Sequence, residues 1–240
     1  MKRLTFLSIL ILLGATVWLL TGCTKSESSS DSRIHSYLID VTSHEVLAPH
    51  AEEVRDRFGF EDDLYQGGTV RISVISHGIY TEAAELEVPP VSSWLTNERD
   101  RIYEVRTFLD GIDTALAGIS SEAAGRTHSE VVRRIARELE VLSARSGKRT
   151  LTIYSDLMEH RDGMSMYHQG VMHRLTTAPD RLARDLFSDT DLPDLTGIEV
   201  RLIGPGPTRA EALRFESLAA VYADVLEDHG ARVTIQTIGP

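Results

Sequence analysis

Carboxylate and hydroxyl side chains occur at three places where an apolar run ends or a helical pattern begins. Asp40 and Thr42 lie at the end of the run 37–41, and Asp156 follows the run 150–155. Thr127 precedes a helical pattern. Oxygen ligands are those that Mg²⁺ prefers, about six of them in an octahedron. If the fold brings the three places together, these residues form a site for Mg²⁺ or Mn²⁺.

The remaining candidate ligands make this site irregular. His44 follows Thr42 by two residues, and an imidazole suits Zn, Ni or Cu better than Mg. Ser43 and Ser129 are alternative hydroxyl ligands, although Ser43 is one residue out of phase. Three outcomes therefore stay open: a weakened Mg²⁺ or Mn²⁺ site, a site with a changed metal preference, or no ion. In the last case the polar residues only cap helices and accept backbone hydrogen bonds.

The elements that must position these residues alternate between strand and helix patterns. Such alternation predicts an α/β fold of three layers (α/β/α), with a mostly parallel central sheet between helices. One antiparallel edge strand is expected at 80–88. The other strands are predicted at 37–41, 69–76, 150–155, 197–203 and 232–238, and the helices at 43–58, 97–119, 131–142, 171–187 and 208–229.

The carboxyl ends of parallel strands share one edge of a sheet, where ligands bind in such folds. Asp40 and Asp156 both stand at that end of their strands, and the loop before the helix at 131–142 leads to the same edge. Thr127 or Ser129 is expected to cap that helix. The sequence therefore places the candidate ligands at one edge, although they are far apart along the chain.

The same segments resemble the von Willebrand factor type A domain over residues 34–240. The metal-ion-dependent adhesion site of that family has Asp-x-Ser-x-Ser after the first strand, and Asp40-Val41-Thr42-Ser43-His44 is similar to it. Thr127 resembles the family's threonine before a middle helix, and Asp156 its later aspartate. The resemblance implies one antiparallel edge strand. It also implies a divalent cation with an open position that captures an acidic group of a protein partner.

The N-terminus has the pattern of an export signal. Lys2 and Arg3 precede an apolar run at 4–20. The following Leu20-Thr21-Gly22-Cys23 resembles the lipobox of bacterial lipoproteins, which implies cleavage before Cys23 and a diacylglyceryl group on its sulfur. A plain membrane anchor or an uncleaved signal is the alternative. Two or three acyl chains hold a protein firmly on a membrane.

Three parts of the chain follow from this pattern. Residues 1–22 are the predicted signal peptide, 23–33 the lipidated cysteine with a polar tether, and 34–240 the α/β domain. The expected location is the bacterial cell envelope. Thr24, rather than Asp, follows the cysteine, and the resemblance to Gram-negative lipoproteins then implies the outer membrane rather than the inner one.

Composition narrows the classes of partner. The chain is 42% hydrophobic, enough for a core, and its formal net charge is −11. An acidic surface argues against nucleic acid as a partner and against adhesion to anionic lipid headgroups. Cys23 is the only cysteine, so the chain forms no internal disulfide.

The stretch 157–195 is weakly patterned and is expected to be a polar surface excursion. Its histidines match no standard zinc spacing, and its methionines are more typical of core or gap-filling positions than of an adaptable binding surface. The histidines are His160, His168 and His173, and the methionines are Met158, Met164, Met166 and Met172.

Three functions fit these observations. The leading hypothesis is a membrane-anchored, non-enzymatic module that binds a protein through the strand-end face. The first alternative is a metal-dependent hydrolase of the cell envelope, which would use His44 or His160 beside Asp40 and Asp156. The second alternative is a metal-free scaffold in an envelope assembly. No Gly-x-Ser-x-Gly motif of a serine hydrolase occurs in the chain.

Overall fold

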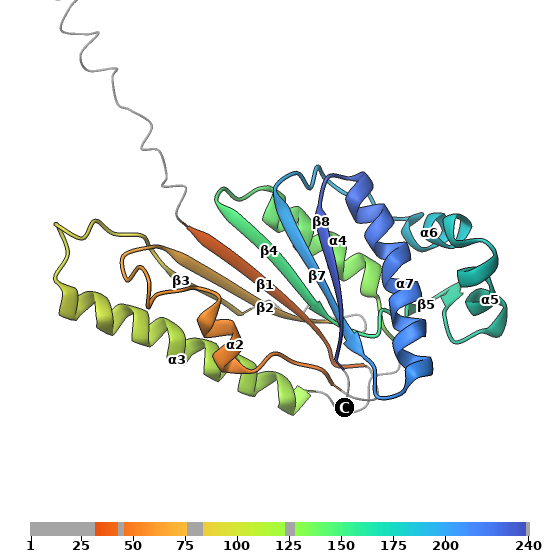
Figure 1. Cartoon of the computed structure of the whole chain (residues 1–240), viewed down its shortest axis with the longest axis horizontal. Helices are drawn as coiled ribbons and strands as arrows, with labels where there is room; N and C mark the ends of the chain where they lie inside the picture. The colour runs from red at the N-terminus through yellow and green to blue at the C-terminus, as the bar shows by residue number, and fades with distance from the viewer. Residues whose placement is uncertain (1–31, 43–45, 76–83, 123–127, 239–240) are drawn as a thin grey trace, which may run out of the picture. The chain divides into compact units, whose positions relative to one another are not determined.

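A computed structural model describes residues 32–42, 46–75, 84–122 and 128–238 (Figure 1). All of them belong to one compact unit, which extends over residues 31–240. The predicted signal and Cys23 lie outside the described residues. Among the helices that are described, none is both long and apolar enough to cross a membrane.

A six-stranded sheet forms the centre of this unit, in the order β3-β2-β1-β4-β7-β8 (Figure 1). Every neighbouring pair is parallel except β2 and β3, which are antiparallel. The predicted α/β fold with one antiparallel edge strand is therefore confirmed. The strands are β1 (Arg33–Asp40), β2 (Gly68–Ile75), β3 (Ala84–Val88), β4 (Lys148–Tyr154), β7 (Ile198–Pro205) and β8 (Arg232–Ile238).

Helices cover both faces of the sheet. The helices α2 and α3 pack on one face, and α4 and α7 pack on the other with α5 and α6 beside α7. The bounds are α2 (Ala51–Asp56), α3 (Glu98–Glu122), α4 (Val131–Ser143), α5 (Gln169–Thr177), α6 (Pro179–Phe187) and α7 (Arg209–Asp228).

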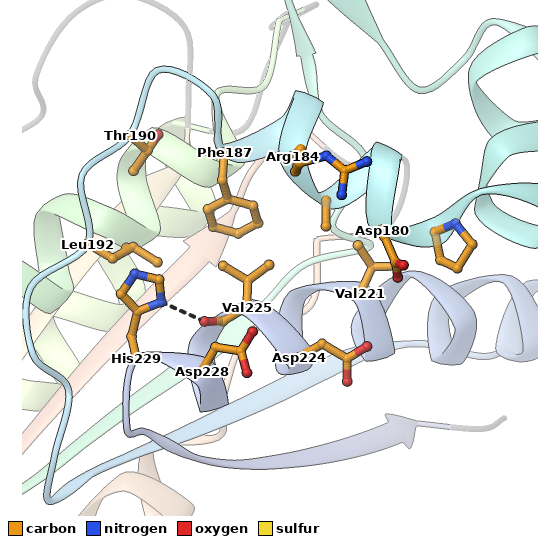
Figure 2. A pocket seen from close by; sticks show the side chains of 12 residues that line it. Asp180, Arg184, Phe187, Thr190, Leu192, Val221, Asp224, Val225, Asp228 and His229 are labelled. Atoms are coloured by element: carbon orange, nitrogen blue, oxygen red, sulfur yellow. Dashed lines mark hydrogen bonds between the residues drawn. The ribbon is translucent and has the colours of Figure 1, made fainter.

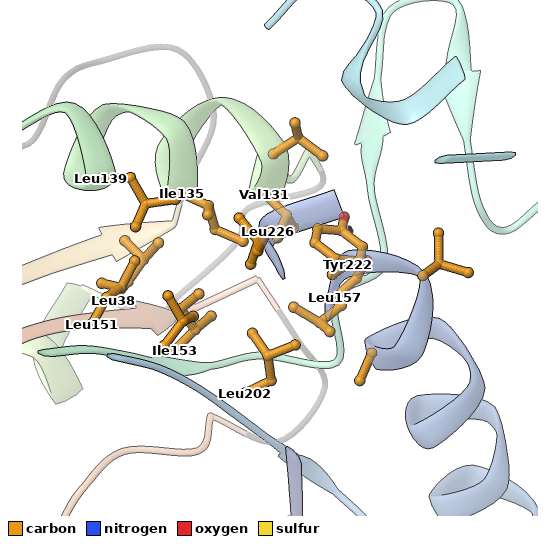
Figure 3. Close-up of a cluster of buried hydrophobic side chains, with 14 of the residues drawn as sticks. Leu38, Val131, Ile135, Leu139, Leu151, Ile153, Leu157, Leu202, Tyr222 and Leu226 are labelled. Atoms are coloured by element: carbon orange, nitrogen blue, oxygen red, sulfur yellow. Dashed lines mark hydrogen bonds between the residues drawn. The ribbon is translucent and has the colours of Figure 1, made fainter. Parts of the chain in front are cut away.

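The larger part of the core lies between the sheet and helices α4 and α7 (Figure 3). Alternate residues of a strand point to opposite faces, so Leu38 of β1 packs on this side, while Tyr37 and Ile39 pack on the α2–α3 side. Leu139 of α4 and Leu226 of α7 are fully buried here. Burying a leucine side chain contributes about 1.5–3 kcal/mol, so this layer holds both helices against the strand ends.

Most boundaries shift by one to three residues, and the starts of β1 and α2 shift by more. The first strand begins at Arg33, four residues before the predicted start at Tyr37, because Arg33 already pairs with Gly68 of β2 and Lys148 of β4. The helix predicted at 43–58 is shorter, because described residues 46–50 are not helical and α2 begins only after Pro49. Proline lacks an N–H and disfavours helical backbone in the residue before it.

The prediction of a polar surface excursion at 157–195 is wrong. Leu157, Met166 and Leu182 are fully buried, because this segment folds back onto α4 and α7 and closes that side of the core. A small hairpin of β5 (His160–Arg161) and β6 (Met164–Ser165) comes first. The single helix predicted at 171–187 is two helices, since α5 ends before Pro179 and α6 begins there.

The methionines of this segment lie in or against the core, as predicted. Met158 and Met166 are buried, and Met164 and Met172 pack against the same cluster while partly exposed. Their flexible side chains fill the space between the hairpin and the helices.

Candidate functional site

Asp40 is the best-connected polar residue at the carboxyl edge of the sheet. Strands β1 and β4 pair in parallel with Ile39 opposite Tyr154, so the residues that follow, Asp40 and Ser155, lie side by side. The Oδ2 atom of Asp40 accepts a hydrogen bond from the Ser155 hydroxyl at 2.7 Å. Its Oδ1 atom accepts from the Thr42 hydroxyl at 2.6 Å and from the Thr42 N–H at 2.9 Å. A carboxylate that is 1% exposed is thereby supplied with three donors.

The loop after β4 continues this network with an unusual backbone conformation. The Ser155 hydroxyl accepts from the N–H of Leu157 at 2.8 Å, and Asp156 Oδ1 accepts from the N–H of Met158 at 2.9 Å. Leu157 has a φ of 60°, and it is the only non-glycine residue with a positive φ in the described part of the chain. Such backbone costs on the order of 1–3 kcal/mol and tends to cluster at functional sites. The Tyr222 hydroxyl donates to the Leu157 carbonyl at 3.2 Å, which helps to hold the loop.

Asp156 differs from Asp40 in its exposure and its charge environment. It is half-buried, and burial together with the negative charge of Asp40 raises its pKa to about 6. The N–H of Met158 and the guanidinium of Arg214 act in the opposite direction. Because the charge of Asp40 disfavours the charged form of Asp156, a cation would be stabilised at this edge.

An exposed tyrosine borders these carboxylates. Tyr167 is 62% exposed, and the charges of Asp156 and Asp40 contribute, after burial, to raising the pKa of its phenol. Its ring packs edge-on against His160, with the ring centroids 5.7 Å apart. The His160 ring stacks on His128 at 4.8 Å, and its Nδ1 lies 3.0 Å from the Ser165 hydroxyl. His160 therefore belongs to an aromatic group at the rim of the edge.

The loop before α4 joins the same edge through backbone hydrogen bonds. Ser129 and His160 exchange two N–H to carbonyl bonds of 2.9 Å each. The expectation that Ser129 caps α4 is wrong, because Glu130 occupies the cap position and its side chain does not cap the helix. The buried Ser129 hydroxyl has no hydrogen-bond partner among the described residues. Thr127, the other expected cap, lies outside the described residues.

Glu159 takes the capping role from a distant part of the chain. Its Oε2 atom accepts from the N–H of Val132 in the first turn of α4 at 3.0 Å, and Oε1 forms an ion pair with Arg161 at 3.2 Å. The side chain is fully buried, and burial raises its pKa to about 7. Glu159 lies 27 positions after Val132 in the chain, so no local pattern indicates the contact, and sequence reasoning missed this residue.

The predicted site residues divide into three groups. Asp40, Thr42 and Asp156 lie together at the carboxyl edge of β1 and β4, and Ser129 lies in the adjoining loop. Three candidates, Ser43, His44 and Thr127, lie outside the described residues. The structure adds Ser155, which the sequence pattern did not single out and which joins Asp40 to the strained loop.

The donors gathered at this edge suit a hard cation by their chemistry. The carboxylates of Asp40 and Asp156 and the hydroxyls of Thr42 and Ser155 all offer oxygen, which Mg²⁺ and Mn²⁺ prefer. The mutual repulsion of the two carboxylates is what a bound cation would relieve. No group of three or more His, Cys, Asp or Glu side chains that could hold a metal is found within the described ranges. The hydroxyls would therefore have to supply part of any coordination.

Comparison with known proteins adds one structural similarity. No family model matches the chain, and no curated protein matches it. Among solved structures, the chain is similar to one described as the SpRpn10 VWA domain, with 10% sequence identity and a TM-score of 0.31. The match covers 87% of this chain and 88% of that one. A similarity this weak identifies no site residue and no function.

Proposed function

We propose that this protein is a lipid-anchored, non-enzymatic binding module of the bacterial cell envelope. In this proposal it contacts a protein partner through the carboxyl edge of the sheet around Asp40 and Asp156. The carrying observation is the network in which buried Asp40 bridges the hydroxyls of Thr42 and Ser155 beside the half-buried Asp156. The resemblance of this edge to the adhesion site of von Willebrand factor type A domains supports the same function.

The arrangement at the edge suits recognition of another protein. Tyr167 supplies exposed aromatic surface, which is enriched in protein interfaces, and it lies beside carboxylates that give polar specificity. Asp40 is already engaged on both oxygens, so it fixes the two loops rather than reaching the partner. Among the described residues of this edge, Asp156 and Tyr167 are side chains that a partner can touch.

A divalent cation fits this proposal as an added element. In this proposal Mg²⁺ or Mn²⁺ is held by the carboxylates of Asp40 and Asp156 and by the hydroxyl of Thr42. Further ligands would come from Ser43, His44, Thr127 or Ser129. A bound cation supplies positive charge to which an acidic group of the partner binds. The metal-free version of the module uses the same face, with Tyr167 and Asp156 making the contact.

Site-specific photo-crosslinking tests the face. The photoreactive residue p-benzoylphenylalanine replaces Tyr167 in one full-length protein, and Trp94, which is 81% exposed before α3, in a control. We expect a defined adduct from position 167 in intact cells, lost when Asp156→Asn is added. Equal adducts from both positions, or an adduct that ignores Asp156→Asn, would refute the proposed face.

Calorimetry separates the metal-bridged module from the metal-free one. Titration of wild-type protein with Mg²⁺ and Mn²⁺ should give heat that the Asp156→Ala variant abolishes. If neither ion gives heat while the crosslink persists, the protein is the metal-free version of the module. Heat that survives in the variant contradicts the assignment of Asp156 as a ligand.

The anchor is tested independently of the face. A Cys23→Ala variant should leave the membrane fraction and lose the acyl mass from its N-terminal peptide. A wild-type N-terminal peptide without acyl mass would remove the lipid anchor from the proposal, whatever the crosslinks show.

A further inference from the structure

A cleft of about 610 Å³ opens between helices α6 and α7, outside the edge described above (Figure 2). Its floor is apolar, with Val221 and Val225 of α7 below the ring of Phe187 from α6, and with Leu192 at one end. His229 lies beside Leu192, and its Nδ1 donates to the Val225 carbonyl at 2.8 Å. Pockets of about 300–1,000 Å³ with apolar floors and few polar groups are typical sites for small molecules.

The rim of this cleft is predominantly acidic. Asp180 of α6 and Asp224 and Asp228 of α7 line it, against a single guanidinium from Arg184. The three carboxylates are exposed, and none of them forms an ion pair or a side-chain hydrogen bond with a described residue. Negative charge therefore exceeds positive charge around an apolar floor.

The end of helix α7 adds to this negative potential. Asp224 and Asp228 are four residues apart, so they face the same side of the helix and repel each other. They stand in its last two turns, where the carbonyl end of the helix dipole is itself negative, and the last turn contains no basic residue. The arrangement costs stability in the free protein, and a cation in the cleft would reverse that cost.

We propose that this cleft is a second binding site, specific for a small amine with an apolar body. The ammonium lies between Asp224 and Asp228, and the apolar body packs on Val221, Val225 and the face of Phe187. An aromatic ring near a cation adds a further attraction. The proposal does not depend on the lipid anchor or on the partner face at Asp156.

Calorimetric titration with phenethylammonium as the probe tests the site. The full-length protein is used, with blank titrations into the same detergent. The neutral analogue 2-phenylethanol and the small cation methylammonium should each bind at least about tenfold more weakly, because each lacks one half of the recognition. The double variant Asp224→Asn/Asp228→Asn should weaken phenethylammonium about tenfold as well.

A matched control variant has the same net charge as the Asp224→Asn/Asp228→Asn variant. The variant Glu61→Gln/Asp62→Asn removes two exposed carboxylates before β2 and should bind phenethylammonium as wild type does. Equal binding of the amine and the alcohol, equal loss in both double variants, or tighter binding of a tetralysine peptide than of phenethylammonium would each overturn the proposal.

Discussion

The strand-end site and the α6–α7 cleft use carboxylates in opposite ways. At the strand ends, Asp40 is buried, and both of its oxygens accept hydrogen bonds from neighbouring residues, three in total. In the cleft, Asp224 and Asp228 are exposed and have no partner among the described residues. The first arrangement stabilises the protein, whereas the second leaves charge available for a ligand.

This difference teaches how each region must be probed. A substitution at Asp40 changes stability and binding together, because the same hydrogen bonds shape the loop that carries Asp156. A substitution at Asp224 changes binding with little effect on the fold. Asp156 stands between these cases, since it is half-buried and has a raised pKa.

The largest effect is expected at Asp40. Asp40→Ala leaves the hydroxyls of Thr42 and Ser155 without their acceptor and should lower the free energy of unfolding by about 4 kcal/mol. Thermal denaturation should show a melting temperature about 10 °C lower. Asp40→Asn keeps the shape of the side chain and one acceptor oxygen, so its free energy of unfolding should fall by less than that of Asp40→Ala. A loss below about 1 kcal/mol for Asp40→Ala would show that the network does not stabilise the edge.

A pH-dependent effect is expected from Glu159, which lies in the loop of the strand-end site. Its pKa is raised to about 7 in the folded protein from an ordinary 4.5, so the folded state binds the proton more tightly. The stabilisation is full below pH 4.5 and is lost as the pH rises through 7. Relative to Glu159→Gln, wild type should lose about 2.5 kcal/mol between pH 5 and 7.5. Chemical denaturation at the two pH values measures this, and parallel curves would contradict it.

His35, on the α2–α3 face of the sheet, should make stability depend on pH in the opposite direction. It is buried edge-on against Phe58, and burial followed by the charges of Arg57, Arg33 and Lys148 lowers its pKa to about 3. The unfolded chain therefore binds more protons below pH 6.5, and stability falls on acidification. Relative to His35→Gln, wild type should lose about 2 kcal/mol between pH 7 and pH 5. A difference between the two proteins that is independent of pH would show that His35 takes up its proton without unfolding.

The smallest change in stability is expected from substitutions in the cleft, and it should be a gain, whereas Asp40→Ala causes a loss. Asp224→Asn/Asp228→Asn relieves the repulsion within the last turns of α7 and should raise the free energy of unfolding by about 0.5 kcal/mol. Chemical denaturation at low ionic strength resolves the change, and added salt should reduce it. A loss of stability would show that these carboxylates support the fold, and the contrast with Asp40 would then disappear.

The sequence by itself determined the layers and the position of the main carboxylates. The period of two in strands and of 3.6 in helices is a local property, so β8 and most of α7 lie where the pattern places them. Asp40 and Asp156 were predictable at one edge because parallel strands end together. The short α2 was not, because Pro49 delays the start of the expected helix until Ala51.

Tertiary structure decided which groups share a contact. Ser155 reaches Asp40 across 115 residues, and Glu159 caps α4 in place of the local Ser129. The burial of the segment with Leu157 and Met166 depends on α4 and α7, and the cleft beside Phe187 depends on α6 and α7. These features arise from packing between elements that are distant in the chain, and no local pattern of residues carries that information.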